Sequence, residues 1–229
     1  MNRLDELVQL ADRGRQFASV RPRSGSRDWY RIRAAAGDRA AVYIYDFIDP
    51  WGVTAADFVA ELNAITAPAI DLHINSGGGL VWDAVAIHAA LRNHAATVDV
   101  SIDGLAASAA SFVAMSGDSI TIEKPAKMMI HDAMALVYGN AAEMTAAATL
   151  LDEISNTIAG IYADRAGGTV EHWRTAMQAE TWYGSAAAVE AGLADRIAND
   201  STSTQAAPDD RRSQLIRARA RVMALRGVA

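Results

Sequence analysis

Residues 70–79, Ile-Asp-Leu-His-Ile-Asn-Ser-Gly-Gly-Gly, are the stretch that decides the fold. Apolar and polar residues alternate in its first half, which predicts a strand, and the glycine-rich second half predicts a sharp turn. Apolar residues from Val81 to Leu91 then recur at helical spacing, and a second β-rich run covers 98–102. Strand, helix and strand in this order predict parallel strands joined by a right-handed crossover, so the expected fold class is α/β.

The same order of elements extends in both directions along the chain. Upstream, residues 41–48 predict a strand, and Thr54 predicts the N-cap of a helix. Downstream, Gly104–Ser111 leads from the second strand into an apolar helix that ends near Met115. The remaining expected elements are short strands over 119–122 and 128–130, a long helix over 140–165, and helices over 170–179 and 186–191, the last closed by Gly192.

Charge divides the 229 residues into three parts. Residues 1–33 carry eight Arg against four acids and residues 201–229 carry six Arg against two acids, whereas 34–200 holds 7 basic and 21 acidic residues. We therefore expect a basic N-terminal extension, one core domain over 34–200 and a flexible basic C-terminal tail. Within the extension, 1–16 predicts an amphipathic helix and 19–28 a linker. The acidic core argues against nucleic-acid binding, which needs a basic face.

Several classes of chemistry are disfavoured by what the sequence lacks. With no cysteine, the chain has no disulfide, no thiolate zinc site and no Cys nucleophile. The metal-binding patterns His-x-x-Glu-His and His-Glu-x-x-His are also missing, so no metal site is expected. The sequence contains no long apolar stretch without charges, so no membrane span is expected, and its first residues do not predict a secretory signal.

The two turns at the strand ends carry the most unusual sequences. The Asn-Ser-Gly-Gly-Gly turn lies between a strand and a helix, where uncovered backbone amides can bind an anion or a developing oxyanion. The alternative is an ordinary tight turn, and the phosphate-binding pattern Gly-x-x-x-x-Gly-Lys-Ser/Thr is absent. Ser108 begins the apolar helix after the second turn, so it is a candidate nucleophile or an N-cap, with the Ala109 amide beside it. Ser111, further along that helix, is expected to face a neighbouring helix.

His131 follows the short strand over 128–130 directly. A histidine at a strand end beside apolar residues is a candidate general base, because imidazole titrates near neutral pH. A structural histidine is the alternative. The order of the three pieces is what favours catalysis: a turn with free amides, a serine at a helix start and a histidine at a strand end follow one another along the chain.

Five motifs in chain order resemble the ClpP family of self-compartmentalised serine peptidases. They extend over most of the core, and Gly77 departs from the family pattern by replacing a proline. The motifs are Ile74-Asn-Ser-Gly-Gly-Gly-Leu-Val81, Gly104-Leu-Ala-Ala-Ser-Ala-Ala-Ser111, Met128-Met-Ile-His131, Gly139-Asn-Ala141 and Ala188-Val-Glu-Ala-Gly-Leu-Ala-Asp195. The resemblance implies a ClpP/crotonase-like superhelix of repeated β-β-α units with a parallel sheet and a protruding handle helix over 140–165.

The resemblance also implies the catalytic roles. Ser108 matches the nucleophile, His131 the general base, and Gly78 and Ala109 the oxyanion-hole amides. The position of the family's third member, usually Asp, is Glu180 here. Asp132 and Asp195 are rivals for that role, although Asp195 belongs to the closing motif.

The apolar segment after His131 matches the family's substrate-pairing strand. We expect Met134, Ala135 and Leu136 to bind an extended peptide by β-augmentation. No metal or cofactor is implied. The handle helix implies a homo-oligomeric ring, a heptamer or a double ring.

A finer resemblance is to the phage ClpP-like head maturation (prohead) proteases. It rests on Val42-Tyr-Ile-Tyr45, Trp51–Phe58 and Glu180-Thr-Trp-Tyr183, together with the basic extensions. This resemblance implies an ATP-independent serine endopeptidase of the host cytoplasm or prohead interior that processes capsid or scaffold proteins. The alternatives are a general cytoplasmic ClpP subunit working with an AAA+ unfoldase, a crotonase-like acyl-CoA enzyme and a non-catalytic ring subunit.

Overall fold

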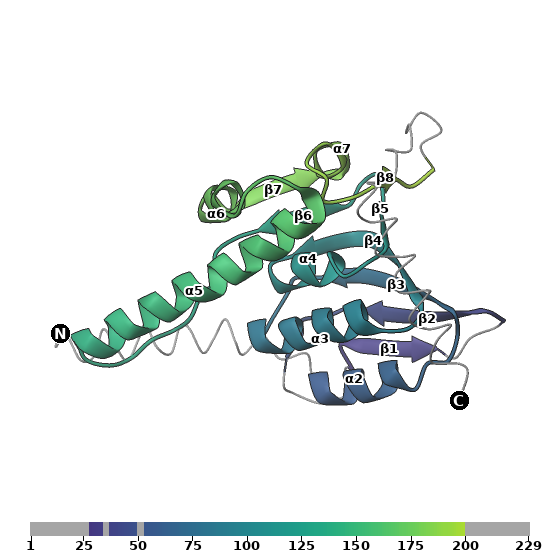
Figure 1. Cartoon of the computed structure of the whole chain (residues 1–229), viewed down its shortest axis with the longest axis horizontal. Coiled ribbons are helices and arrows are strands. Elements are labelled where there is room, and N and C mark those ends of the chain that lie inside the picture. The colour runs from purple at the N-terminus through teal and green to yellow at the C-terminus, as the bar shows by residue number, and fades with distance from the viewer. Residues whose placement is uncertain (1–27, 34–36, 50–52, 200–229) are drawn as a thin grey trace, which may run out of the picture.

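The computed structural model describes residues 28–33, 37–49 and 53–199 (Figure 1). The helix predicted over 1–16 and the tail predicted over 201–229 lie outside these residues. The predicted linker lies outside them as well, apart from Asp28.

The described residues form a mixed α/β structure, as the order of elements predicted. The sheet has the strand order β1-β2-β3-β4-β5-β8, with β6 pairing with β4 and β7 pairing with β6. Pairing is parallel from β2 through β8, and only β1 on β2 and β7 on β6 are antiparallel among the described pairs. The strands are β1 Tyr30–Arg33, β2 Arg39–Ile44, β3 Ala69–Ser76, β4 Thr97–Ala107, β5 Ser119–Ile122, β6 Lys127–Ile130, β7 Thr181–Gly184 and β8 Arg196–Ile197.

The helices lie in two groups around this sheet. Helices α2 and α3 cover one face of the sheet, whereas α5 projects away from it as a long arm beside α6 (Figure 1). The helices are α2 Ala55–Asn63, α3 Val81–Asn93, α4 Ala109–Ala114, α5 Ala141–Ala166, α6 Val170–Gln178 and α7 Ser185–Glu190.

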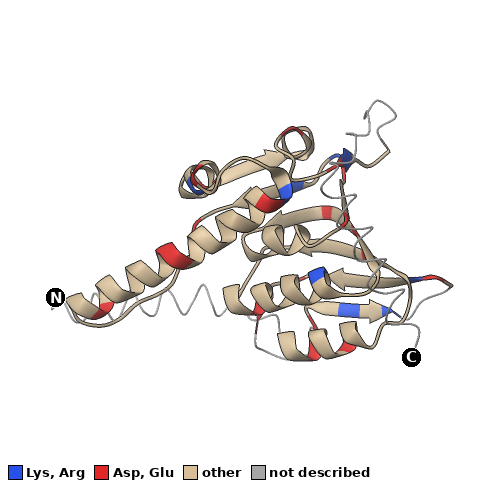
Figure 2. Cartoon of the chain, in the orientation of Figure 1, with Lys and Arg blue, Asp and Glu red and all other residues tan. Residues whose placement is uncertain are grey.

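Helix α5 begins and ends where its sequence favours it. Asn140 and Glu143 form a reciprocal capping box at its N-terminus, and Gly167 follows its last residue with a positive φ of 82°. Acidic residues are spaced along the arm, and Arg165 lies in the last turn, where a cation offsets the helix dipole (Figure 2). The first half of the arm is exposed, and its second half packs on the core.

Alternation along the central strands produces a two-sided sheet. Side chains such as Leu72 and Val100 are buried under the helices, while their neighbours in the strand face outward. On the outer face Arg39 forms ion pairs with Asp71 and, at 2.6 Å, with Asp99. The guanidinium of Arg39 lowers the pKa of Asp71. Part of the acidic character of the core therefore lies on this polar face.

The sheet begins before the predicted boundary at residue 34. Strand β1 pairs with β2, and Trp29 and Tyr30 are buried against Phe58 of α2. The Trp29 indole also donates a hydrogen bond to the carbonyl of Val53 at 2.8 Å. Residues 29–33 thus belong to the core domain rather than to the extension.

Strand β4 positions the site because it changes partner half-way along. Its first half pairs with β5, and its second half pairs with β6 through Leu105, Ala106 and Ala107. The end of β4 therefore lies beside the end of β6. Ser108 follows the first strand directly and His131 follows the second, so the topology brings these two residues together.

Candidate active site

Ser108 stands in a strained turn between β4 and α4. Its φ and ψ are 53° and −126°, a conformation that costs a non-glycine residue about 1–3 kcal/mol. The turn is held by a hydrogen bond from the Ser108 amide to the carbonyl of Met129, 2.9 Å away on β6. Such a strand-to-helix elbow presents the hydroxyl of its central serine at the sheet edge.

His131 is in direct contact with this hydroxyl. Its Nε2 lies 2.7 Å from Ser108 Oγ, within the range required for a base to take the hydroxyl proton. The contact joins two residues that are far apart in the sequence. The N-cap alternative does not account for this contact, because Ser108 makes no side-chain hydrogen bond to α4.

Gly78 lies against the other side of the serine. Its φ is +102°, and a Cβ placed on it would lie 2.7 Å from Ser108 Cβ and 2.8 Å from the Ala109 nitrogen. Only glycine fits at this position. Gly78 therefore packs directly against Ser108 and the first residue of α4. In the described structure the Gly78 amide makes a long hydrogen bond of 3.2 Å to Ser76 Oγ.

The structure does not bring Glu180 into contact with His131. Glu180 follows α6 with a positive φ of 47°, and its exposed carboxylate accepts a hydrogen bond from the Trp182 indole at 3.4 Å. Of the two rivals, Asp132 pairs with Arg174 and Asp195 pairs with Arg165. Within the described ranges no carboxylate hydrogen-bonds to His131.

A groove of about 340 Å³ opens beside the Ser108–His131 pair. Met134 and Ala135 line it, whereas Leu136 is 85% exposed and does not. The segment 133–137 forms no strand in the structure. The opposite wall is apolar and comes mainly from the start of α3, from α4 and from α5: Leu80, Val81, Trp82, Phe112, Leu150, Leu151, Ile154 and Ile158.

A buried chain of hydroxyl groups joins the serine turn to α5. Ser111 Oγ donates to the carbonyl of Ser108 and lies 2.7 Å from the hydroxyl of Tyr162. Ser111 thus faces a neighbouring helix, as the sequence predicted. Because the single Ser111 hydroxyl proton goes to the Ser108 carbonyl, the Tyr162 hydroxyl is the donor to Ser111. Burial raises the pKa of Tyr162 far above its usual value.

Three further polar residues lie near the site and were not predicted from the sequence. Tyr162, Ser155 and Arg174 each reach the site region from α5 or α6, and each contact spans more than 20 residues of sequence. The position of each residue in its helix predicts which face of that helix it occupies, but not which residue elsewhere in the chain it contacts. No local signal could have identified their partners.

Comparison with known proteins gives a family for this architecture. A family model described as Clp protease matches residues 24–201. The chain belongs to the Clp protease family. It is 30% identical over 131 residues to the ATP-dependent Clp protease proteolytic subunit of Chlorella vulgaris. The matched stretch covers 56% of this chain and 65% of that protein. It is 31% identical over 133 residues to ATP-dependent Clp protease proteolytic subunit 2 of Cutibacterium acnes, covering 56% and 61%.

A third relative is the ATP-dependent Clp protease proteolytic subunit of Staurastrum punctulatum, 31% identical over 137 residues, or 58% of this chain and 68% of that protein. The matched stretch spans less than two thirds of the length of the first two relatives. The names of these three relatives describe Clp protease proteolytic subunits and do not mention phage head maturation. Among the described residues, no helix combines the length and apolar character needed to cross a membrane.

Proposed function

We propose that this member of the Clp protease family is a serine endopeptidase. The observation that carries the proposal is the 2.7 Å contact between Ser108 Oγ and His131 Nε2, made beside the Gly78 and Ala109 amides. A crotonase-like acyl-CoA enzyme has no need of a Ser–His pair. A non-catalytic ring subunit has no need of a strained serine turn, because strain of this kind is retained where a function uses it.

The proposed reaction is acyl transfer to Ser108. His131 Nε2 takes the hydroxyl proton while Ser108 Oγ attacks the peptide carbonyl carbon, and the carbonyl oxygen becomes an oxyanion. The Gly78 and Ala109 amides donate to this oxyanion, so Gly78 exchanges its long bond to Ser76 for a shorter one. His131 then gives the proton to the leaving amine as the peptide bond breaks. In the second half His131 takes a proton from water, the water oxygen attacks the acyl carbon, and the proton passes to Ser108 Oγ as the ester bond breaks.

The groove and the segment over 133–137 are the proposed peptide site. Met134 is 79% exposed and lies at the groove, so its backbone is open to pairing with an extended chain. Leu136 continues the same segment away from the catalytic pair. A peptide bound along Met134, Ala135 and Leu136 would present one of its carbonyl groups to Ser108.

Glu180 is the proposed third member of the triad, on the strength of its place in the family motif. Reaching His131 would require its carboxylate to leave Trp182. We expect Glu180→Ala to lower kcat by at least about 100-fold with the assembly unchanged, because the imidazolium would lose its orienting anion. Steady-state kinetics combined with gel filtration test this, and a normal kcat would remove Glu180 from the mechanism.

A homo-oligomeric ring, either a heptamer or a double ring, is part of the proposal, with the exposed half of α5 as a contact surface between copies. The substrate is proposed to be a capsid or scaffold protein, on the basis of the prohead-like sequence motifs. A general proteolytic subunit fed by an AAA+ unfoldase agrees equally well with the family relatives. Cleavage of assembled scaffold protein without ATP favours the first, and dependence on an unfoldase favours the second.

Peptide hydrolysis in the presence of EDTA and without nucleotide tests the proposed chemistry. We expect full activity on fluorogenic peptides under these conditions, because the Ser108–His131 mechanism uses neither a metal ion nor ATP. Loss of activity in EDTA that zinc or magnesium restores would contradict the mechanism.

A further inference from the structure

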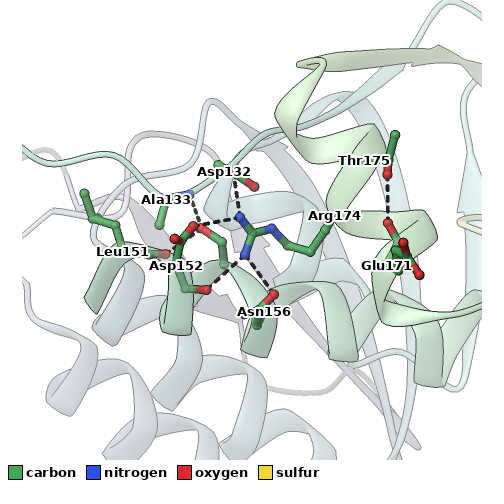
Figure 3. Close-up of polar contacts among 9 residues, drawn as sticks. Asp132, Ala133, Leu151, Asp152, Asn156, Glu171, Arg174 and Thr175 are labelled. Carbon is green, nitrogen blue, oxygen red and sulfur yellow. Dashed lines mark hydrogen bonds and ion pairs between the residues drawn. The ribbon is translucent and has the colours of Figure 1, made fainter. Parts of the chain in front are cut away.

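Arg174 connects three segments of the chain, as Figure 3 shows, and one of them begins at Asp132, the residue that directly follows His131. It comes from α6, its exposed fraction is 9%, and one of its terminal nitrogens lies 3.0 Å from the Asp132 carboxylate and 3.1 Å from that of Asp152. The other donates to the carbonyl of Asp152 at 3.0 Å and to the Asn156 side chain at 2.8 Å. A planar guanidinium can serve all these acceptors at once, which a lysine ammonium cannot.

The segment that Arg174 holds is the one that leaves the active site. Asp132 follows His131 directly, and Ala133 is the first residue of the proposed peptide segment. The Ala133 amide donates to Ser155 Oγ of α5 at 3.0 Å, and Ser155 in turn donates to the carbonyl of Leu151. Arg174 and Ser155 therefore fix two consecutive residues after His131 to the same face of α5.

The ion pairs around Arg174 are not well suited to stabilising the folded chain. Among the residues that the structure describes, nothing hydrogen-bonds to Asp132 Oδ1 or to Arg174 Nε, although both atoms are buried, and each such atom is costly. Buried ion pairs contribute little net stability compared with apolar packing. What the cluster does provide is a fixed position for the backbone next to His131.

We infer that Arg174 is a positioning residue for His131, an inference that rests on the proposed peptidase function. By holding Asp132 against α5, it keeps His131 Nε2 within reach of Ser108 Oγ. The peptide segment keeps its own anchor, because the Ala133–Ser155 hydrogen bond does not involve Arg174. Loss of Arg174 therefore affects the chemical step and not peptide binding.

The chain offers a matched control. Arg165 of α5 is also nearly buried, at 10% side-chain exposure, and forms a 2.8 Å ion pair with Asp195 near the far end of α5. It lines neither the groove nor the serine turn. Arg165→Met breaks the ion pair with Asp195, and Arg174→Met breaks those with Asp132 and Asp152. Both changes therefore lower stability, but only the second removes a contact with the residue beside His131.

The test is steady-state kinetics of both variants in the full chain, at a temperature where each is folded. We expect Arg174→Met to lower kcat and kcat/KM equally by about 10- to 100-fold, the range that small misplacement of a catalytic group produces. Arg165→Met should keep the kcat of the wild-type chain. An unchanged kcat in Arg174→Met, or an equal loss in Arg165→Met, would overturn the inference.

Hydrogen exchange separates this inference from the proposed function. Exchange at the amides of 130–132, the backbone around His131, should be faster in Arg174→Met than in Arg165→Met, whether or not the chain cleaves peptides. If the wild-type chain proves inactive while this difference is found, the proposed function fails and the anchoring of the segment stands. If Arg174→Met does not fold, Arg174→Lys decides, and wild-type exchange together with wild-type kcat in that variant would refute the inference.

Discussion

Replacing Ser108 by alanine is expected to lower kcat for peptide hydrolysis by about 10⁴-fold or more, because the nucleophile of acyl transfer is lost. The fold should persist, since alanine keeps the Cβ and the backbone hydrogen bond from residue 108 to the carbonyl of Met129. Initial rates on a fluorogenic peptide, together with thermal unfolding, measure both effects. Residual activity within tenfold of the wild-type chain would contradict the assignment of Ser108.

Glycine at the same position separates catalysis from strain. Ser108→Gly should be as inactive as Ser108→Ala but more stable than it by about 1 kcal/mol, because glycine adopts a positive φ without a steric penalty while gaining freedom in the unfolded chain. Denaturant unfolding of the two variants gives the difference. Equal stability would show that the turn is relaxed in solution.

Replacing Gly78 by alanine should have an effect nearly as large. The new methyl group would approach Ser108 Cβ, the carbonyl of Ala107 and the amide of Ala109, all within 2.8 Å, at a φ of +102°. The turn must shift, and the shift removes one oxyanion donor, which typically costs about 100- to 1000-fold in kcat. We expect a loss of at least that size with a lowered melting temperature, measured by kinetics and calorimetry.

Gly77→Ala is the matched control for Gly78→Ala. The three atoms nearest to its methyl group would all belong to the ring of Phe47, an exposed side chain that can rotate away, and Gly77 has no positive φ. We expect kcat to stay within about threefold of the wild-type chain. A loss as large as that of Gly78→Ala would mean that the whole turn, rather than the Gly78 amide, determines activity.

The central part of the fold could be predicted from the sequence because its local signals are strong. Alternation in β3 and the glycine-rich turn that follows determine the first crossover, and the alternation of apolar and polar residues in the first half of β4 determines the second strand. Strands β1, β7 and β8 were missed. The first two are four residues long and pair antiparallel at the margins of the sheet, and β8 has only two residues, so few alternating residues distinguish them from loops.

Motif order singled out Ser108 and His131 as a candidate catalytic pair, but their contact follows from topology. Only the change of partner half-way along β4 shows why a serine and a histidine 23 residues apart meet. Glu180 illustrates the limit of a motif, which places a residue in the chain without setting its side-chain partner. Arg174 carried no signal, since its partners lie on the segment after His131 and on another helix.

Covalent labelling of Ser108 by a fluorophosphonate, mapped by mass spectrometry, tests the central claim most directly. The probe reacts only with a serine whose hydroxyl is activated by a base beside an oxyanion site. We expect one adduct per wild-type chain, located on Ser108, and none in Ser108→Ala. An intact wild-type oligomer that remains unlabelled, or an adduct that persists in Ser108→Ala, would contradict the claim that Ser108 and His131 form a peptidase active site.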